Sequence, residues 1–418
     1  MLQQKGLSMT GSTRRRLAIA SLGAGIFIAP SGCAYLMRRF LKCLSLNRRG
    51  TRVAAVLALT AAASLTFAAC GGGSAGTPGG EASGGGAGGE VPVTLITKDN
   101  NNPYWISMQK GADAAAAKNG VTLTKAAGAN QSDEDGQVKA IEAAVARGDK
   151  GILIAPNGSG VNGAIENARS QGIYVIALDT VPSPADTVDG TIATDNFKAG
   201  ELIGKWTAGT LNGGKATIAM LDLFNDKIVT VDVDRDQGFL TGMGIDTKDK
   251  TQNGDEAASG KYTGGKGGDY TFVCHEPTQG AQDSGKTAME ACLAKSKDIN
   301  VVYTINEPSA SGAAEALDVA GIKDALVTSI DGGCSPGIQL VKNGTIGATS
   351  QQYPVKMAEI GLEAIKKMID TNGAEGKPQN GPGLSFQDAG VALVTDKPVQ
   401  GVPSITSAEA EKNCWGGN

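Results

Sequence analysis

The sequence predicts an α/β protein built as two doubly wound lobes, each a mostly parallel sheet with helices on both faces. The chain has 418 residues, enough for two ordinary domains and additional tails. From Val91 onward, apolar runs of strand length alternate with amphipathic segments of helix length, a pattern typical of parallel sheets buried on both faces. About ten such runs are too many for one doubly wound sheet, so we expect two lobes.

The expected elements alternate along the chain. We expect helices over residues 108–118, 163–170 and 199–207. The expected strands are residues 93–97, 151–155, 174–178, 190–193, 216–221, 270–273, 299–304, 325–330, 346–349 and 391–394. In sheets of this kind ligands bind beyond the carboxyl ends of the strands. The residues directly after each strand are therefore the candidates for function.

Basic and acidic residues are distributed unevenly. Of 38 Lys and Arg, ten lie within residues 1–70, which contain no Asp or Glu, so the remainder carries 28 bases against 42 acids. Such an acidic body is unfavourable for binding polyanions, and we expect no nucleic-acid partner. The single His275 leaves no material for a His-rich metal site, and a Ser-His-Asp triad would have to use it. We expect no catalytic residue, metal or cofactor.

The N-terminal segment has the features of an export signal. Three arginines precede an apolar run over residues 53–67, which is followed by two alanines and Cys70. This run is too short to span a bilayer, and the pattern is typical of a bacterial lipoprotein signal. We expect residues 1–69 to be the signal, with 1–36 upstream of the true start, and 70–90 to be a lipidated Cys70 and a Gly-rich tether. An ordinary cleaved signal is the alternative, and the paired arginines also suit twin-Arg export.

Cysteine usage agrees with a location outside the cytoplasm, at the cell membrane. The body of the chain contains an even number of cysteines, Cys274, Cys292, Cys334 and Cys414. Outside the cytoplasm this suggests disulfides, and three pairings are possible. We favour Cys274–Cys292 and Cys334–Cys414, because the second would tie the C-terminus to the body. Four free buried thiols are the alternative.

Polar and aromatic side chains follow most of the expected strands. Carboxylates, amides and one Arg suit the recognition of paired hydroxyls, and aromatic faces suit the C–H surface of a sugar-like ring. The alternative is that each Asp or Asn caps a helix, and that the two aromatic residues belong to the core or a lid. The set is Lys98, Asn102, Tyr104, Trp105, Asp179, Asp195, Asn196, Arg235, Asn306, Asp331 and Gln352.

Residues 91–400 resemble the type I periplasmic sugar-binding proteins of the ribose-binding kind. The matching segments, in order, are Asn101-Asn-Pro-Tyr-Trp105, Val175-Ile-Ala-Leu-Asp179, Thr194-Asp-Asn196, Arg235-Asp-Gln-Gly-Phe239, Ser329-Ile-Asp-Gly332 and Gln352-Tyr-Pro354. Carried over by position, the resemblance implies that the sugar is held by Asn102, Tyr104, Trp105, Asp179, Arg235, Asn306, Asp331 and Gln352. Two departures argue against ribose: an extra residue before Asn102, which brings Lys98 toward the site, and Thr180 where ribose binders have Arg.

The resemblance also implies an organisation and partners. Three crossovers would join lobe one, residues 91–194 plus 353–388, to lobe two, residues 195–352 plus 389–418. The ending over 392–416 is similar to the fructose-binding branch, which makes fructose the first expected ligand. The lobes would close on the sugar by a hinge motion. The implied partners are the permease and ATPase subunits of an ABC importer, and a monomer is expected.

Other functions are also compatible with the residues. Gly158-Ser-Gly160-Val-Asn-Gly163 has the dinucleotide-binding spacing after a strand, so an NAD-dependent sugar dehydrogenase is one alternative. We interpret these glycines as a tight turn in which Ser159 caps the following helix. Receptors for another pentose, a polyol or a signal molecule, and a sensor module, are the others. We interpret His275 as a loop residue.

Overall fold

The computed structural model describes residues 91–379 and 385–417, in which two sheets carry helices on both faces. This confirms the predicted fold class. The predicted signal, Cys70 and the Gly-rich tether lie outside the described residues. Among the described residues, no helix is both long and apolar enough to cross a membrane.

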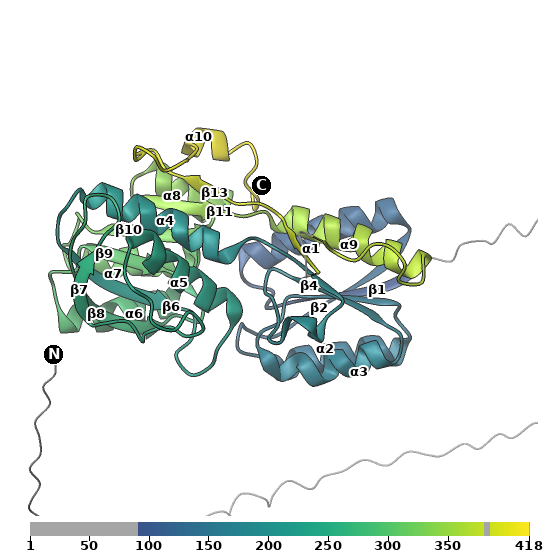
Figure 1. The fold of residues 1–418 in the computed structure, drawn as a ribbon. Helices are drawn as coiled ribbons and strands as arrows, with labels where there is room; N and C mark the ends of the chain where they lie inside the picture. The colour runs from purple at the N-terminus through teal and green to yellow at the C-terminus, as the bar shows by residue number, and fades with distance from the viewer. Residues whose placement is uncertain (1–90, 380–384, 418) are drawn as a thin grey trace, which may run out of the picture. The chain divides into compact units, whose positions relative to one another are not determined.

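Lobe one contains a six-stranded sheet whose strands are all parallel, in the order β12-β5-β4-β3-β1-β2. Helices α1 and α9 cover one face, and α2 and α3 cover the other (Figure 1). The strands are β1 (Val91–Thr97), β2 (Val121–Ala127), β3 (Gly151–Ile154), β4 (Tyr174–Leu178), β5 (Gly190–Ala193) and β12 (Phe386–Asp388). The helices are α1 (Pro103–Asn119), α2 (Glu134–Arg147), α3 (Asn162–Ser170) and α9 (Pro354–Asp370).

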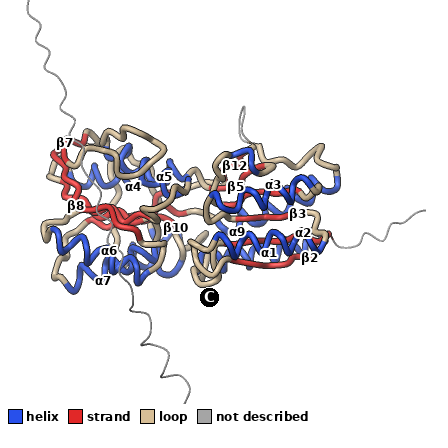
Figure 2. The backbone as a smooth tube through the Cα atoms, turned by 90° about the horizontal axis from the view of Figure 1, so that it is seen from below, coloured by secondary structure: helices blue, strands red, loops and turns tan. Residues whose placement is uncertain are grey.

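Lobe two contains a seven-stranded sheet in the order β13-β11-β10-β9-β6-β8-β7, parallel except for its two edge strands. Figure 2 shows α4 and α5 on one side of this sheet and α6 and α7 on the other. The strands are β6 (Ala216–Asp222), β7 (Ser259–Tyr262), β8 (Gly268–Pro277), β9 (Val301–Thr304), β10 (Leu326–Asp331), β11 (Ala348–Gln351) and β13 (Ala392–Val394). The helices are α4 (Asn196–Leu211), α5 (Thr230–Met243), α6 (Gln282–Lys295), α7 (Glu307–Val319), α8 (Gln339–Lys342) and α10 (Ser407–Ala410).

The chain crosses between the two sheets three times: after β5, after β11 and after β12. The last crossing is short, since β12 and β13 are separated only by residues 389–391. The C-terminal tail then returns toward lobe one, where the Trp415 ring lies 5.2 Å from that of Tyr104. Residues from both ends of the described chain therefore meet beside the same crossovers.

Each expected strand is present, and three strands were not expected: β2, β7 and β12. All three are edge strands with polar or half-exposed residues, so they lack the continuous apolar run that marks a buried parallel strand. The interpretation of His275 as a loop residue was wrong. It lies within β8, paired in register with Met220 of β6.

The beginning of α1 shows how local sequence positions the site. The Asn102 side chain accepts a hydrogen bond from the Tyr104 backbone N–H at 2.9 Å, and Pro103 occupies the first turn, where no amide partner is needed. The helix ends at Gly120, whose φ of 64° favours glycine. Because the first turn is fixed directly beyond β1, both aromatic residues start from a rigid element.

Both predicted disulfides are confirmed. Cys274 pairs with Cys292, linking β8 to α6, and Cys334 pairs with Cys414. The second disulfide closes a separation of 80 residues and is reinforced by a hydrogen bond from the Cys334 N–H to the Trp415 carbonyl. The alternative of four free thiols is therefore excluded, and the C-terminal tail is tied to the body.

Candidate ligand-binding site between the lobes

A cavity of about 20 Å³ lies where the carboxyl ends of both sheets meet. This volume has room for about one water molecule. The side chains around it come from six strand ends or the segments that follow them, and from α1 and α5. The lining residues are Lys98, Asn102, Tyr104, Trp105, Gln131, Asp179, Leu223, Val231, Arg235, Ile305, Asn306, Asp331 and Gln352.

Two carboxylates project into the cavity from equivalent places in the two lobes. Asp179 follows β4 of lobe one, and Asp331 ends β10 of lobe two. Both have positive φ, 65° for Asp179 and 139° for Asp331, a backbone conformation that costs on the order of 1–3 kcal/mol in a non-glycine residue. Such strain concentrates at functional sites because it directs a side chain that relaxed backbone would point elsewhere.

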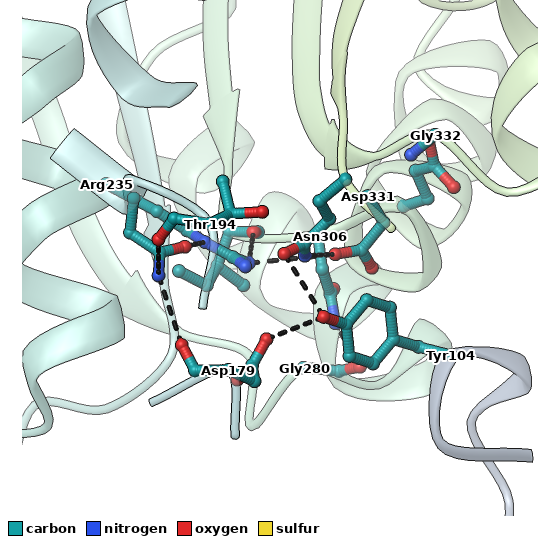
Figure 3. Close-up of polar contacts among 12 residues, drawn as sticks. Tyr104, Asp179, Thr194, Arg235, Gly280, Asn306, Asp331 and Gly332 are labelled. Carbon is teal, nitrogen blue, oxygen red and sulfur yellow. Dashed lines mark hydrogen bonds and ion pairs between the residues drawn. The ribbon is translucent and has the colours of Figure 1, made fainter. Parts of the chain in front are cut away.

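In lobe one, Asp179 is the centre of a small hydrogen-bonded group. Its Oδ1 accepts a hydrogen bond from the Tyr104 hydroxyl at 2.8 Å (Figure 3), and its Oδ2 accepts one from the Thr180 hydroxyl at 2.8 Å. The Lys98 Nζ lies 3.9 Å from Oδ2. The Tyr104 hydroxyl also lies 3.2 Å from Gln352 Oε1. One carboxylate therefore orients both a phenol and an ammonium at the cavity wall.

In lobe two, Arg235 of α5 holds the equivalent position. Its Nε donates to Asn196 Oδ1 at 2.8 Å, and its Nη1 donates to the Ile305 carbonyl at 2.9 Å and lies 3.8 Å from Asp331 Oδ1. Asp331 also accepts a hydrogen bond from the Gln352 side-chain amide at 2.8 Å. The guanidinium is thus fixed at three points, which leaves its planar fork in a single orientation.

Burial changes the protonation behaviour of the charged groups. Burial lowers the pKa of Lys98 to about 8, against the opposing effect of the Asp179 carboxylate. Burial raises the pKa of Asp331 to about 7, although the Arg235 guanidinium and the Gln352 amide act to lower it. With two acids and two bases around the cavity, the charges balance, which favours an uncharged, hydrogen-bonding ligand over an ionic one.

Aromatic rings form one wall of the cavity. Tyr104 contacts Trp105 edge to face at 4.7 Å between ring centroids, and Trp415 packs on its other side. The Trp105 side chain is 3% exposed, and its indole N–H has no hydrogen-bond partner in the described structure. Buried indole donors usually find an acceptor, so this donor is available to a ligand oxygen in the cavity.

Nine of the ten residues predicted for the site line this cavity, and Asp195 does not. Asp195 is exposed and caps α4 by accepting a hydrogen bond from the Lys198 N–H at 2.8 Å. Capping also explains part of the role of Asn102 and of Asn306, whose side chain accepts from the Ser309 N–H at 3.1 Å. These two residues line the cavity while capping α1 and α7, so the capping and binding interpretations are compatible.

Several residues of the site were not predicted. Gln131 and three apolar residues, Leu223, Val231 and Ile305, line the cavity. None of the apolar residues differs in sequence from ordinary core positions, and Gln131 follows an edge strand that the pattern did not reveal. Trp415 supports the site from outside by donating from its indole N–H to the Gln352 carbonyl at 2.9 Å.

The glycine motif at 158–163 accommodates a protein carboxylate. The Gly160 N–H donates to Glu134 Oε2 at 2.7 Å, and a Cβ on Gly158 or Gly160 would lie within 2.2 Å of a Glu134 carboxylate oxygen. The expectation that Ser159 caps the next helix was wrong, because α3 begins at Asn162 without a side-chain cap. The loop therefore already has an anionic partner where a dinucleotide fold would place a pyrophosphate.

Glu134 also connects the two lobes. Its Oε1 lies 2.8 Å from the Nζ of Lys227, which is in the segment between β6 and α5 of lobe two. Lys227 also donates to the Asn157 carbonyl of lobe one at 3.0 Å. The glycine motif thus positions one half of an ion pair that bridges the lobes beside the cavity.

Comparisons with known proteins agree on the kind of protein that this fold represents. A family model described as "Periplasmic binding protein domain" matches residues 93–375. The ribose import binding protein RbsB of Salmonella typhimurium LT2 is 26% identical over 278 residues, covering 66% of this chain and 84% of that protein. The galactofuranose-binding protein YtfQ of Escherichia coli K12 is 29% identical over 266 residues, covering 61% of this chain and 75% of that protein.

A solved structure resembles the fold over most of the described chain. It is an ABC transporter solute binding protein from Agrobacterium vitis with bound D-fucose, with a TM-score of 0.61 and 24% identity. The match covers 78% of this chain and 100% of that one. At this identity the likeness supports the fold alone.

Proposed function

The chain belongs to the periplasmic binding protein family, and we propose that it is an extracytoplasmic receptor that binds a monosaccharide between its two lobes. In this proposal the loaded receptor delivers its sugar to the permease and ATPase subunits of an ABC importer. The named relatives are binding proteins for ribose and galactofuranose. These names, together with the cavity, support a carrier rather than a catalyst.

The observation that carries the proposal is the composition of the cavity wall. An unpartnered, buried indole N–H lies beside two balanced pairs of charged groups, Lys98 with Asp179 and Arg235 with Asp331. A sugar presents adjacent hydroxyls on one edge and a C–H surface on its faces. The charged groups match the hydroxyls, and the rings of Tyr104 and Trp105 match the C–H surface.

Sugar entry requires movement, because a cavity of about 20 Å³ is smaller than any monosaccharide. The groups that would hold the sugar now bond to one another, as in the contact between the Tyr104 hydroxyl and Asp179. We infer that the lobes separate at the three crossovers to admit the sugar, which then replaces these contacts as the lobes close. The three crossovers would divide lobe one (91–194 and 353–388) from lobe two (195–352 and 389–418).

The finer assignments are part of the same proposal. Fructose is the first expected ligand, on the basis of the ending over 392–416 and of Lys98 and Thr180 at the site. The export signal over 1–69 and lipidation of Cys70 would hold the receptor at the outer face of the cell membrane through a Gly-rich tether. A monomer is the expected state.

The test is calorimetric titration of the purified protein against fructose, ribose, galactose, allose and myo-inositol. We expect saturable heat with a monosaccharide, strongest with fructose, and no NAD-dependent oxidation of that sugar. Heat with ribose but not fructose would overturn the choice of sugar. An absence of heat with every compound would overturn the ligand class, and turnover with NAD would overturn the carrier role.

A further inference from the structure

A second polar cluster lies inside lobe two, on the face of its sheet that α5 covers. Met220 of β6 pairs in register with His275 of β8 on one side and with Tyr303 of β9 on the other. Side chains in register on parallel strands point to the same face, and Asp222 is two residues beyond Met220 on that face. Asp236 approaches from α5, so that one ligand atom each of Asp222, Asp236 and His275 lies within 4.8 Å of the others.

The histidine is oriented by a carboxylate outside this trio. Its Nε2 lies 2.8 Å from Glu256 Oε1, and its Nδ1 lies 3.3 Å from Asp222 Oδ2. Histidines that bind metal ions usually donate their second ring N–H to a carboxylate, which fixes the tautomer and directs the other nitrogen at the metal. Glu256 is placed for that role, and Nδ1 faces Asp222 and Asp236.

Buried oxygen atoms around this point have no hydrogen-bond partner in the described structure. They are Asp222 Oδ1, Asp236 Oδ2 and the Tyr303 hydroxyl. Asp236 and Tyr303 are 0% exposed and Asp222 is 4% exposed, so bulk water does not compensate for the missing bonds. Buried polar atoms are nearly always paired, and an ion or ordered water is the usual reason when protein atoms do not pair them.

The cluster is reached from the surface through its own cavity. A pocket of about 350 Å³ is lined by Asp222, Asp232 and His275, together with the exposed residues Asn225 and Asp226. An ion could therefore enter without passing through the site between the lobes. Asp232 itself is occupied, since its carboxylate accepts the Leu223 and Phe224 N–H groups at 2.8 and 3.0 Å.

From this geometry we propose that lobe two holds a divalent transition-metal ion, Zn²⁺ or Mn²⁺, ligated by Asp222, Asp236 and His275. Two carboxylate oxygens with one imidazole nitrogen suit these ions, whereas Ca²⁺ and Mg²⁺ prefer oxygen ligands alone. The single histidine of the chain does not prevent such a site, because the two aspartates supply the other ligands. The site is separate from the proposed sugar site and does not depend on it.

The alternative occupant is a proton. A protonated His275 between Asp222 and Glu256 would satisfy both ring nitrogens without a metal ion, while leaving Asp236 Oδ2 unpartnered. The two possibilities differ in stoichiometry and in spectroscopy, which makes them separable.

The experiment uses the untagged protein, stripped with a chelator and dialysed to equilibrium against Zn²⁺ or Mn²⁺. We expect one ion bound per chain, an increased unfolding temperature with the ion present, and X-ray absorption that shows one imidazole and carboxylate oxygens around the metal. Absence of stoichiometric binding of either ion, or a bound ion without imidazole scattering, would overturn the proposal in favour of the protonated histidine.

Variants localise the ion. Asp236→Asn should abolish stoichiometric binding, and Glu256→Gln should weaken it by about 10- to 100-fold, because the histidine loses its orienting carboxylate. The matched control is Asp226→Asn, which removes a charge from the same pocket but not from the three ligands and should bind the ion as the wild type does. Unchanged binding by Asp236→Asn, or loss of binding in Asp226→Asn, would overturn the assignment. Cooperative unfolding of each variant verifies that it is folded.

Discussion

The two lobes present the same arrangement to the cavity between them but differ in how rigidly they hold it. Each places an aspartate with positive φ at the end of a strand and a basic side chain beside it: Lys98 with Asp179 in lobe one, and Arg235 with Asp331 in lobe two. Arg235 is fixed by Asn196 and the Ile305 carbonyl, whereas the ammonium of Lys98 has Asp179 as its ion-pair partner.

The aromatic contribution is also unequal. Tyr104 and Trp105 belong to lobe one, and Trp415 of the tail packs against the same rings. Lobe two contributes apolar contacts only through small patches such as Leu223 and Ile305. Lobe one is therefore suited to bind the face of a sugar ring with some tolerance, and lobe two to fix the orientation of its hydroxyls.

The largest expected effect follows from breaking the rigid side. Arg235→Ala should weaken sugar binding at least 100-fold, roughly 3 kcal/mol or more, because it removes a fixed fork and leaves Asp331 buried without its charged partner. Arg235→Lys keeps the charge but not the planar geometry, and should fall between the two. Calorimetry measures both affinities, and a wild-type affinity in Arg235→Ala would show that orientation is not set by lobe two.

A smaller loss is expected from the tolerant side. Trp105→Phe keeps an aromatic face and removes only the unpartnered N–H, so binding should weaken about 5- to 30-fold, or about 1–2 kcal/mol. Trp105→Ala should weaken it further because the face is also lost. If Trp105→Phe binds normally, the indole N–H does not contact the sugar and ring stacking alone accounts for the residue.

The difference in protonation between the two bases gives a pH test. Because burial lowers the pKa of Lys98 to about 8, the ammonium is present below that pH and is lost as pH rises through it, whereas Arg235 stays charged. Wild-type affinity should be full near pH 7 and fall about fivefold by pH 9 relative to Lys98→Met. Identical pH profiles for the two proteins would contradict this role of Lys98.

The smallest expected effect concerns the contact that joins the lobes. Glu134→Gln weakens a partly exposed ion pair with Lys227, worth on the order of 0.5–1 kcal/mol, and should reduce sugar affinity two- to fivefold by destabilising the closed form. Glu276→Gln is the matched control, since Glu276 pairs with Lys295 within lobe two at 2.6 Å. Equal affinities for the two variants would show that the bridging pair does not stabilise closure.

The fold and most of the site could be predicted from the sequence because both follow from strands. Continuous apolar runs such as 174–178 mark buried parallel strands, and the rule that ligands bind beyond strand ends then selects residues such as Asp179 and Asp331. The family resemblance extended the selection to Tyr104 and Trp105. Edge strands escaped because one-sided burial leaves little apolar pattern, as in β7, where three of four residues are exposed.

Contacts between distant segments could not be predicted in the same way. His275 lies 53 positions from Asp222, and nothing in its local sequence indicates that β6 and β8 are neighbours. The pattern that selected Asp179 equally selected Asp195, which caps a helix at the surface. Trp415 was invisible for a different reason: its partner Tyr104 lies more than three hundred residues away, and their contact depends on the path of the tail.

The link between Cys334 and Cys414 has a practical consequence for anyone who produces this protein. It holds the tail whose indole ring braces Tyr104, so oxidation of two thiols far from the cavity supports an aromatic residue inside it. Material made in a reducing cytosol would lack this staple and release a wall of the binding site, while most of both sheets stayed intact. Recombinant preparations should therefore be compared by their thiol content before their affinities are compared.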